Sequence, residues 1–270
     1  MRTAGLPPEL RRSRWRPNAA ERRELRRDKF YWERVRRAER AYAAQLRQVA
    51  RNVANMVDAF AQPLDINQTP ELVEMLHGYA RILDPWARVT AARMIQEVSR
   101  RDAGAWFKVS REIGLNLREM IENAPIGGVI RRLLEDQVEL ITSLPIEAGR
   151  RVQAHTQEFV MGGKRYDELV DIVRSSGDVT VSRATLIART ETAKAQSAIV
   201  QARAQHIGSD HYIWHTVRDN AVRDMHRRLE GTVQDWSNPP VAEENGERHH
   251  PGNFPNCRCY AEPILPAVIT

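Results

Sequence analysis

The sequence predicts a mostly α-helical N-terminal region followed by a small α+β module near the C-terminal end. Before Gly208, apolar side chains recur at helical spacings of three and four, whereas after it they alternate as in β-strands. The 270 residues include only five Phe, six Tyr and six Trp, which disfavours a strand-rich fold. With 42% hydrophobic residues, the chain can form a core in one large domain or two ordinary ones.

The N-terminal end is expected to be a flexible basic arm, residues 1–18, because it combines several Pro and Arg with little apolar content. A long amphipathic helix is expected from about Ala19 until Pro63 stops it, and its upstream half is dense in charge. Its apolar face has helical spacing and consists of Tyr42, Leu46, Val49, Val53, Met56, Val57 and Phe60.

Further helices are expected in the region 19–163. Thr69-Pro70 and Asp84-Pro85 each place a capping side chain before a Pro, which is typical of a helix start, so a short helix should follow each pair. Two more helices are expected on either side of a break at residues 123–128. Another should run from about Pro145 to Val160 and end at Gly162-Gly163.

The α+β module is expected at 164–265, followed by a short tail, 266–270. It should begin with a short helix, 166–173, closed by Ser175-Ser176-Gly177, and a second helix should run from Ser182 or Thr185 to near Gly208. Strand-like alternation marks residues 211–217, 231–236 and 260–265, and a loop rich in Pro, Gly and Asn joins the last two.

The net charge of +6 is unevenly distributed. Residues 1–60 carry 16 Lys and Arg against 7 Asp and Glu, a charge of +9, while the rest of the chain carries −3. The aromatic side chains of Trp15, Phe30, Tyr31 and Trp32 lie among the positive charges, a mixture that suits phosphate contacts and base stacking, although an Arg-rich helix is also an ordinary solvated face. We therefore expect a polyanionic partner, double-stranded DNA or an acidic protein surface, for Arg22, Arg23, Arg26, Arg27, Lys29, Arg34, Arg36, Arg37 and Arg40.

Candidate metal ligands gather in the C-terminal module: His226, His249, His250, Cys257 and Cys259. Thiolates and imidazoles suit Zn²⁺, and a tetrahedral site needs four such groups from separate segments. A disulfide between two cysteines separated by one residue would be strained. Two alternatives remain: a shared metal ion, or reduced thiols packed in a small core.

Four motifs in this module occur in a characteristic order. They are S-R-A-T-L-I-A-R-T-E-T at 182–192, Trp214, D-N-A-V-R-D-M-H at 219–226 followed by L-E-G at 229–231, and N-C-R-C at 256–259. In order and spacing this series resembles the Mu protein F-like family of phage head morphogenesis proteins. The resemblance covers about the last hundred residues.

The resemblance implies a minor head protein of a phage, made in the host cytoplasm and then kept in the virion, inside the head and near the portal. Its implied partners are the portal protein, major capsid or scaffold proteins and packaged double-stranded DNA, with no membrane and no enzymatic activity. The resemblance also implies a structural role for a set of motif residues: Arg189, Thr190, Glu191, Asp219, Arg223, Asn256 and Arg258.

Some family members have C-x-x-C where this chain has Arg223 and His226, and those members look like zinc modules. Here His226, Cys257 and Cys259 keep three of four candidate ligand positions, and Phe254 replaces the family's His before N-C-R-C. His249 or His250 would have to supply the fourth ligand. Without zinc, Asn256 and Arg258 are expected to hold the loop through backbone carbonyls, and Asp219 to pair with Arg223 on a helical turn.

The alternative function is a zinc-dependent DNA-processing enzyme, a nuclease, which the His and Asn content of the loop would suggest. Such an enzyme needs a general-base His on a strand beside metal ligands on a following helix, whereas His249 and His250 lie in a Pro- and Gly-rich loop. Glu191 is expected at the seam between its helix and the strands, paired with an Arg such as Arg189, Arg218 or Arg223.

Overall fold

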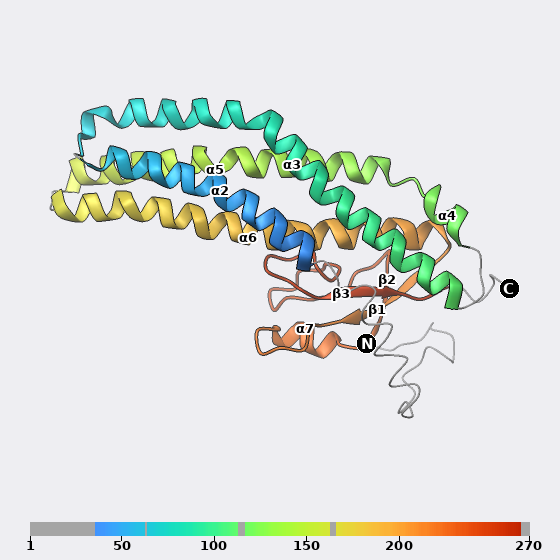
Figure 1. The fold of residues 1–270 in the computed structure, drawn as a ribbon. Coiled ribbons are helices and arrows are strands. Elements are labelled where there is room, and N and C mark those ends of the chain that lie inside the picture. The colour runs from blue at the N-terminus through green and yellow to red at the C-terminus, as the bar shows by residue number, and fades with distance from the viewer. Residues whose placement is uncertain (1–35, 63, 113–116, 163–165, 266–270) are drawn as a thin grey trace.

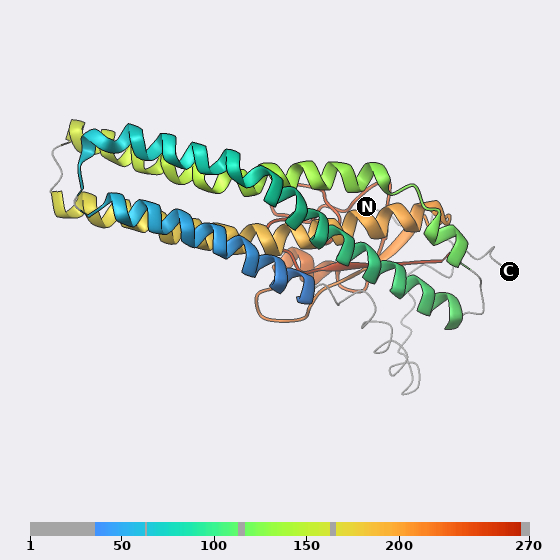
Figure 2. The same ribbon diagram turned by 45° about the horizontal axis from the view of Figure 1, so that its top comes forward.

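The computed structural model describes residues 36–62, 64–112, 117–162 and 166–265. Long helices run side by side as an elongated bundle, and a small sheet lies against one end of it (Figures 1 and 2). The bundle consists of α2 (Arg36–Phe60), α3 (Thr69–Glu112), α5 (Gly127–Gly162) and α6 (Tyr166–His206). Short helical segments are η2 (Ile66–Gln68), α4 (Arg118–Glu122) and α7 (Asp224–Leu229). The predicted fold class, mostly α with a small C-terminal α+β module, is confirmed.

The sheet has three antiparallel strands in the order β2-β1-β3, formed by β1 (His211–His215), β2 (Val233–Asp235) and β3 (Tyr260–Pro263). Ile213 of β1 pairs with Val233, and Trp214 pairs with Ala261. The three predicted strands are therefore confirmed, each a little shorter than expected. The 24 residues between β2 and β3, 236–259, carry the ligand candidates after α7 and contain an isolated bridge, Val241 to Arg248.

Both α3 and α5 run through an internal Pro, so the helix starts predicted at Asp84-Pro85 and at Pro145 are wrong. A Pro inside a helix removes one backbone hydrogen bond and bends the helix, but packing on both sides can outweigh that loss. Leu83 and Ala87 flank Pro85 and are buried, and Pro145 is itself buried. Figure 1 shows α3 changing direction along its length. The start at Thr69-Pro70, the break before Gly127 and the end at Gly162 are confirmed.

Helix α6 is continuous, so the helix end predicted at Ser175-Ser176-Gly177 is wrong. Gly177 lies where α6 crosses α2, and a Cβ built on it would be 2.8 Å from the Cβ of Ala54. The glycine is therefore a contact residue that lets two helices approach closely. Because the helix is unbroken, it contributes Val173 to the far core of the bundle and Val200 to the core beneath the sheet.

We predict that Gly177→Ala destabilises the protein although Ala is the better helix former. The added methyl group must push α2 and α6 apart, and overpacking of this kind costs about 1–3 kcal/mol. Gly104→Ala, in α3, is the matched control because a Cβ there meets no atom within 4 Å. It should be neutral or stabilising by up to about 1 kcal/mol. Thermal unfolding of both variants checks this, and equal stabilisation of the two would contradict the close contact.

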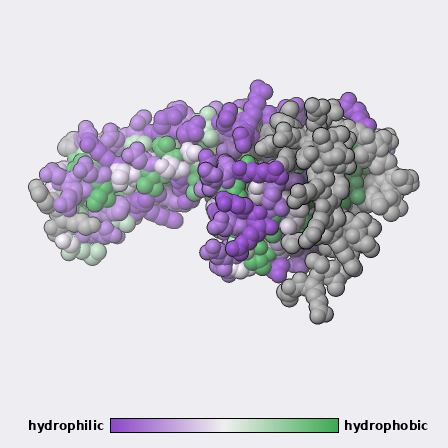
Figure 3. All heavy atoms as spheres, turned by 90° about the horizontal axis from the view of Figure 1, so that it is seen from below, coloured by the Kyte–Doolittle hydropathy of each residue, from purple (hydrophilic) through white to green (hydrophobic). Residues whose placement is uncertain are grey.

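The described core forms clusters along the bundle and changes in character beneath the sheet. Aliphatic side chains such as Leu46, Ile95 and Ile141 fill the bundle, whereas Tyr212, Trp214, Trp236 and Trp106 fill the region beneath the sheet. The face over α7 and its adjoining loops is mainly hydrophilic (Figure 3). Among the described residues, no helix has both the length and the apolar character needed to cross a membrane.

Candidate metal centre

The turn before the two cysteines is held by the R-T-E segment of α6. The backbone N–H of Asn256 donates to Thr190 Oγ1 at 3.1 Å, and Arg189 donates to Asn256 Oδ1 at 3.4 Å. Asn256 has φ +60°, a left-handed conformation that Asn tolerates better than most residues. Two predicted motifs far apart in sequence therefore meet, and their contact fixes where the next residue, Cys257, points.

A second set of contacts holds Arg258, which lies between the two cysteines, and Pro255, which lies just before Asn256. Arg258 forms a two-pronged ion pair with Asp219, with N···O distances of 2.6 and 2.8 Å. Arg223 donates to the Pro255 carbonyl at 2.9 Å and lies 3.8 Å from the Glu243 carboxylate. The expected pairing of Asp219 with Arg223 is therefore wrong, because each residue instead bonds across to the cysteine loop.

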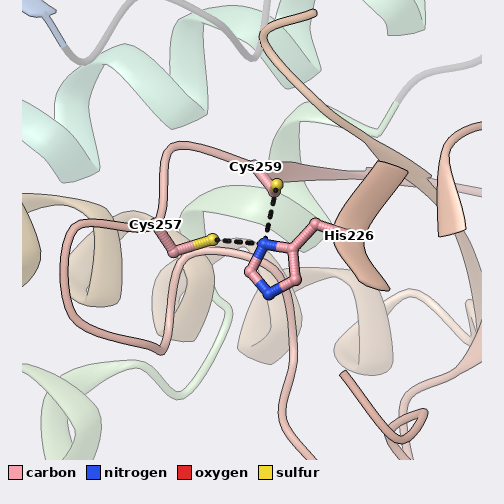
Figure 4. A group of neighbouring side chains, drawn as sticks. All are labelled: His226, Cys257 and Cys259. Carbon is pink, nitrogen blue, oxygen red and sulfur yellow. Dashed lines mark hydrogen bonds between the residues drawn. The ribbon is translucent and has the colours of Figure 1, made fainter. Parts of the chain in front are cut away.

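The cysteines and His226 form a compact buried group (Figure 4). His226 Nδ1 lies 3.6 Å from Cys257 Sγ and 3.5 Å from Cys259 Sγ, and the three ligand atoms all lie within 4.8 Å of one another. The three residues are only 2%, 2% and 6% exposed. His226 comes from α7, and the cysteines come from the segment that enters β3, so the short helix and the sheet edge together position the group.

The opposite nitrogen of His226 faces Glu243, a residue that sequence analysis missed. His226 Nε2 lies 3.1 Å from Glu243 Oε1, and His249 Nε2 lies 3.3 Å from the same oxygen. A carboxylate at Nε2 favours the tautomer with its proton on Nε2, which leaves the Nδ1 lone pair directed at the two sulfurs. Glu243 lies in an irregular loop, so no periodicity could have singled it out.

The two candidates for a fourth ligand are placed away from the sulfurs. His249 belongs with Glu243, on the other side of the His226 ring, and stacks on Phe254 with ring centroids 5.1 Å apart. His250 Nδ1 lies 3.0 Å from the Tyr212 hydroxyl, and its Nε2 lies 3.4 Å from Gln201. His250 is thus a hydrogen-bonding residue of the core beneath the sheet, and the expectation that it ligates a metal is corrected.

The electrostatics of the group favour one thiolate. A hydrogen bond from the Cys259 thiol, helped by the nearby His226, lowers the pKa of Cys257 to about 4 in spite of its burial. The hydrogen bond that the Cys259 thiol donates to Cys257 raises the pKa of Cys259, and burial raises it further. Burial opposes the charged form of His226, but its hydrogen bond to Cys257 outweighs this and raises the pKa of the imidazole. The backbone N–H of Gly252 also points at Cys257 Sγ, at 3.4 Å.

The three donors and their spacing fit three of the four positions of a tetrahedral zinc site. Nitrogen and sulfur ligands of a tetrahedral Zn²⁺, at about 2.0–2.1 and 2.3 Å from the metal, lie about 3.6 Å apart. The observed N···S distances are 3.6 and 3.5 Å. His226, Cys257 and Cys259 would therefore hold the ion, and Glu243 would orient the imidazole. Gly252 has φ +88°, and a Cβ there would lie 3.0 Å from the Ala193 carbonyl oxygen, so the loop beside the sulfurs requires glycine.

Glu191 is not at the seam with the strands, and no Arg in the described part of the chain is its partner. Its Oε2 accepts a hydrogen bond from Gln137 at 2.9 Å, and Gln137 Oε1 in turn accepts one from Tyr42 at 2.9 Å. Its other oxygen pairs with Lys194 at 2.8 Å. The expected placement is wrong because successive helical residues point about 100° apart, so Thr190 faces the cysteine loop while Glu191 faces α5 and α2.

The predicted basic contact residues lie partly outside the described part of the chain. Arg22, Arg23, Arg26, Arg27, Lys29 and Arg34 are outside the described residues, as are the aromatic residues predicted among them. Arg36, Arg37 and Arg40 lie on the first turns of α2 and are exposed. Arg37 points to a different face from the other two, because it lines a separate cavity with Thr90 and Arg93.

His215 makes the stability of the module dependent on pH. Burial disfavours its charged form, but the Glu230 carboxylate 3.6 Å from Nδ1 and a hydrogen bond to Glu262 outweigh this and raise the pKa of the imidazole above 6.5. The stabilisation is therefore complete below pH 6.5 and is lost as the pH rises through the higher folded pKa. We predict that the melting temperature falls over this range and that His215→Gln reduces the fall. His206→Gln, an exposed control, should leave it almost unchanged; an unaltered slope in His215→Gln would contradict the assignment.

Comparison with known proteins agrees with the motif order. Residues 150–262 match the family described as Phage Mu protein F like protein. An uncharacterized protein of Haemophilus influenzae is 30% identical over 173 residues, which cover 62% of this chain and 38% of that protein. The chain thus spans well under half the length of this relative. No solved structure matches the chain. The region from residue 150 to residue 262, which holds the R-T-E helix and the buried His226–Cys257–Cys259 group, is a Phage Mu protein F like region, as its motifs predicted.

Proposed function

We propose that this protein is a minor head protein of a bacteriophage, assembled into the virion at the inner side of the head near the portal. In this role it contacts the portal protein, neighbouring capsid or scaffold proteins and packaged DNA, and it has no catalytic activity. The observation that carries the proposal is the Phage Mu protein F like region at residues 150–262, which relates the protein to phage heads. The position near the portal and the capsid partners follow from the family resemblance, and the positive charge of residues 1–60 also supports a DNA contact.

The geometry of the motif residues supports a structural role. Thr190 bonds to Asn256, and Asp219 pairs with Arg258, so these residues tie segments of the module to one another. The motif therefore maintains a shape, which is what an assembly component needs.

The burial of the His–Cys group argues against the nuclease alternative. A hydrolytic metal must have an open coordination position that a phosphate and a water can reach. His226 and Cys257 are 2% exposed, and the Glu243 and His249 side chains are 14% and 10% exposed. Cys257 and Cys259 border a cavity of about 590 Å³, but the low exposure of the three residues leaves little of the group accessible to a DNA duplex.

Zinc in this group would act as a cross-link. We propose that it joins α7 to the segment before β3, a role that burial suits and that needs no access for substrate. The ion would supply folding free energy, and the chain would supply the fixed direction of each ligand.

The test is the composition of purified phage heads. Mass spectrometry of DNA-filled virions should detect the protein at low copy number, and cross-linking within procapsids should join it to the portal protein. Ultraviolet cross-linking of filled heads should join it to DNA. A non-structural protein of the same phage, carried through the same purification, is the negative control. Absence from heads would refute the proposal, and Mg²⁺- or Zn²⁺-dependent cleavage of DNA by the purified protein would favour the nuclease.

A further inference from the structure

A cavity of about 590 Å³ opens between the first turns of α2, the middle of α6 and the cysteine loop. Three separate segments contribute guanidinium groups to its lining: Arg36, Arg40 and Arg47 from α2, Arg189 from α6 and Arg258 from the loop. Glu39 and Asp219 are the acidic residues in the same lining. The lining therefore carries a formal charge of +3. By contrast, all the residues after residue 60 together carry a charge of −3.

The two acidic residues are already paired. Glu39 lies 3.4 Å from Arg189, and Asp219 forms the two-pronged pair with Arg258. Within the described ranges, Arg36, Arg40 and Arg47 form no ion pair. Arg36 and Arg40 are exposed, and Arg47 is half-buried. Arg36 also helps to lower the pKa of Asp219 through its charge, but none of the three guanidinium groups is held in an ion pair with a described residue, so each can pair with a ligand.

The three available Arg residues form a row. At 100° per residue, positions 36, 40 and 47 lie within about 40° of one another around α2, and at 1.5 Å per residue the row is about 16 Å long. Ala43, which is buried, lies in the same row between Arg40 and Arg47 and also lines the cavity. An extended chain rises about 3.3 Å per residue, so about six residues match the length of the row.

The shape of the cavity favours a peptide over a DNA duplex. Its volume lies within the range of about 300–1,000 Å³ typical of recessed small-ligand pockets, and a duplex presents phosphates on a broad convex surface. The lining also includes apolar groups from Ala193, Val217 and Tyr260, against which the stems of Asp or Glu side chains can pack. Arg is the side chain best suited to bind carboxylates in two-pronged pairs.

We propose that this cavity binds an extended acidic segment of a partner protein, with two or more Asp or Glu side chains paired to Arg36, Arg40 and Arg47. The proposal deepens the assembly role and rests on it for the identity of the protein that carries the segment. The binding chemistry itself is independent of that role. If the protein were absent from purified heads, the proposed role as a head protein would be refuted. The affinity of the cavity for acidic peptides would not be affected by that result.

The test uses the full chain and a synthetic hexaglutamate peptide that carries a fluorophore and a photo-cross-linker. Anisotropy should show binding that weakens with salt, and the cross-links should map to residues lining the cavity. Arg36→Gln/Arg40→Gln/Arg47→Gln should weaken binding at least 10-fold. Arg37→Gln is the matched control, since Arg37 lies on the same first turn but lines another cavity, and it should change affinity less than about 2-fold. A hexaglutamine peptide should not bind.

Three results would overturn the proposal. The first is no binding of the hexaglutamate peptide to the wild-type chain. The second is cross-linking confined to residues 1–35. The third is a triple variant that loses affinity for a 20-base-pair duplex and keeps its affinity for the peptide, because the cavity would then be a DNA contact. If the triple variant is unstable, Arg40→Gln alone keeps the test valid. It should weaken peptide binding about 2- to 5-fold, as the loss of one exposed ion pair would.

Discussion

Replacing Cys257 or Cys259 with Ser is expected to unfold the C-terminal module at physiological temperature. If His226 and the two sulfurs hold zinc, metal-coupled folding contributes free energy on the order of 10 kcal/mol. That amount is comparable to the whole stability of an ordinary domain, about 5–15 kcal/mol, so the module could not compensate for its loss. Limited proteolysis of the segment after α6, together with elemental analysis of protein purified without a His tag, measures both the unfolding and the metal.

The matched control is His250→Gln, which changes a buried imidazole beneath the same sheet that lies away from the sulfurs. It loses the hydrogen bond to Tyr212, costs about 1–2 kcal/mol and should leave the zinc content at one ion per chain. A chelator should reproduce the effect of the Cys variants in the wild-type protein. Zinc content near zero, a chelator without effect and a cost of only about 1–2 kcal/mol per Cys would instead identify the group as packed thiols.

Asp102→Asn is expected to have the next largest effect, because it leaves a charged Arg203 without its partner in the interior. The carboxylate of Asp102 in α3 lies 2.6 Å from Arg203 of α6, and the two side chains are 2% and 6% exposed. Burial raises the pKa of Asp102 to about 6 against the attraction of Arg203, so the pair is charged at pH 7.5. Removing one partner of such a pair costs about 3–5 kcal/mol, or roughly 10 °C in melting temperature for a chain of this size.

Asp84→Asn provides the control in the same helix, because Asp84 and Arg88 form an exposed pair with 43% and 55% of their side chains accessible. Exposed pairs contribute less than about 1 kcal/mol. Thermal unfolding at pH 7.5 compares the two variants. The double variant Asp102→Leu/Arg203→Met should recover most of the loss, because it removes both buried charges together. Equal melting temperatures for Asp102→Asn and Asp84→Asn would show that the buried charge carries no special cost.

The type of each helix or strand could be predicted from the sequence more reliably than the position of its ends. Helical spacing over Tyr42–Phe60 and the alternation over His211–His215 predicted the correct element type, because burial of one face depends on local periodicity. The breaks predicted at Pro85, Pro145 and Gly177 were wrong for a common reason. Whether such a residue ends a helix depends on what packs against it, and Gly177 turned out to be the contact with Ala54 of α2.

The sequence by itself determined the family region, the mostly α fold with its small sheet, and three neighbouring candidates, His226, Cys257 and Cys259. Motif order and periodicity are local properties that can be found along the chain. Only the tertiary structure decided that Glu243 faces His226, that Asp219 pairs with Arg258 and that Glu191 faces Gln137 and Lys194. Polar partners far apart in sequence, or in irregular loops, are selected by the direction each side chain takes after the helices have packed, and no spacing in the sequence records that direction.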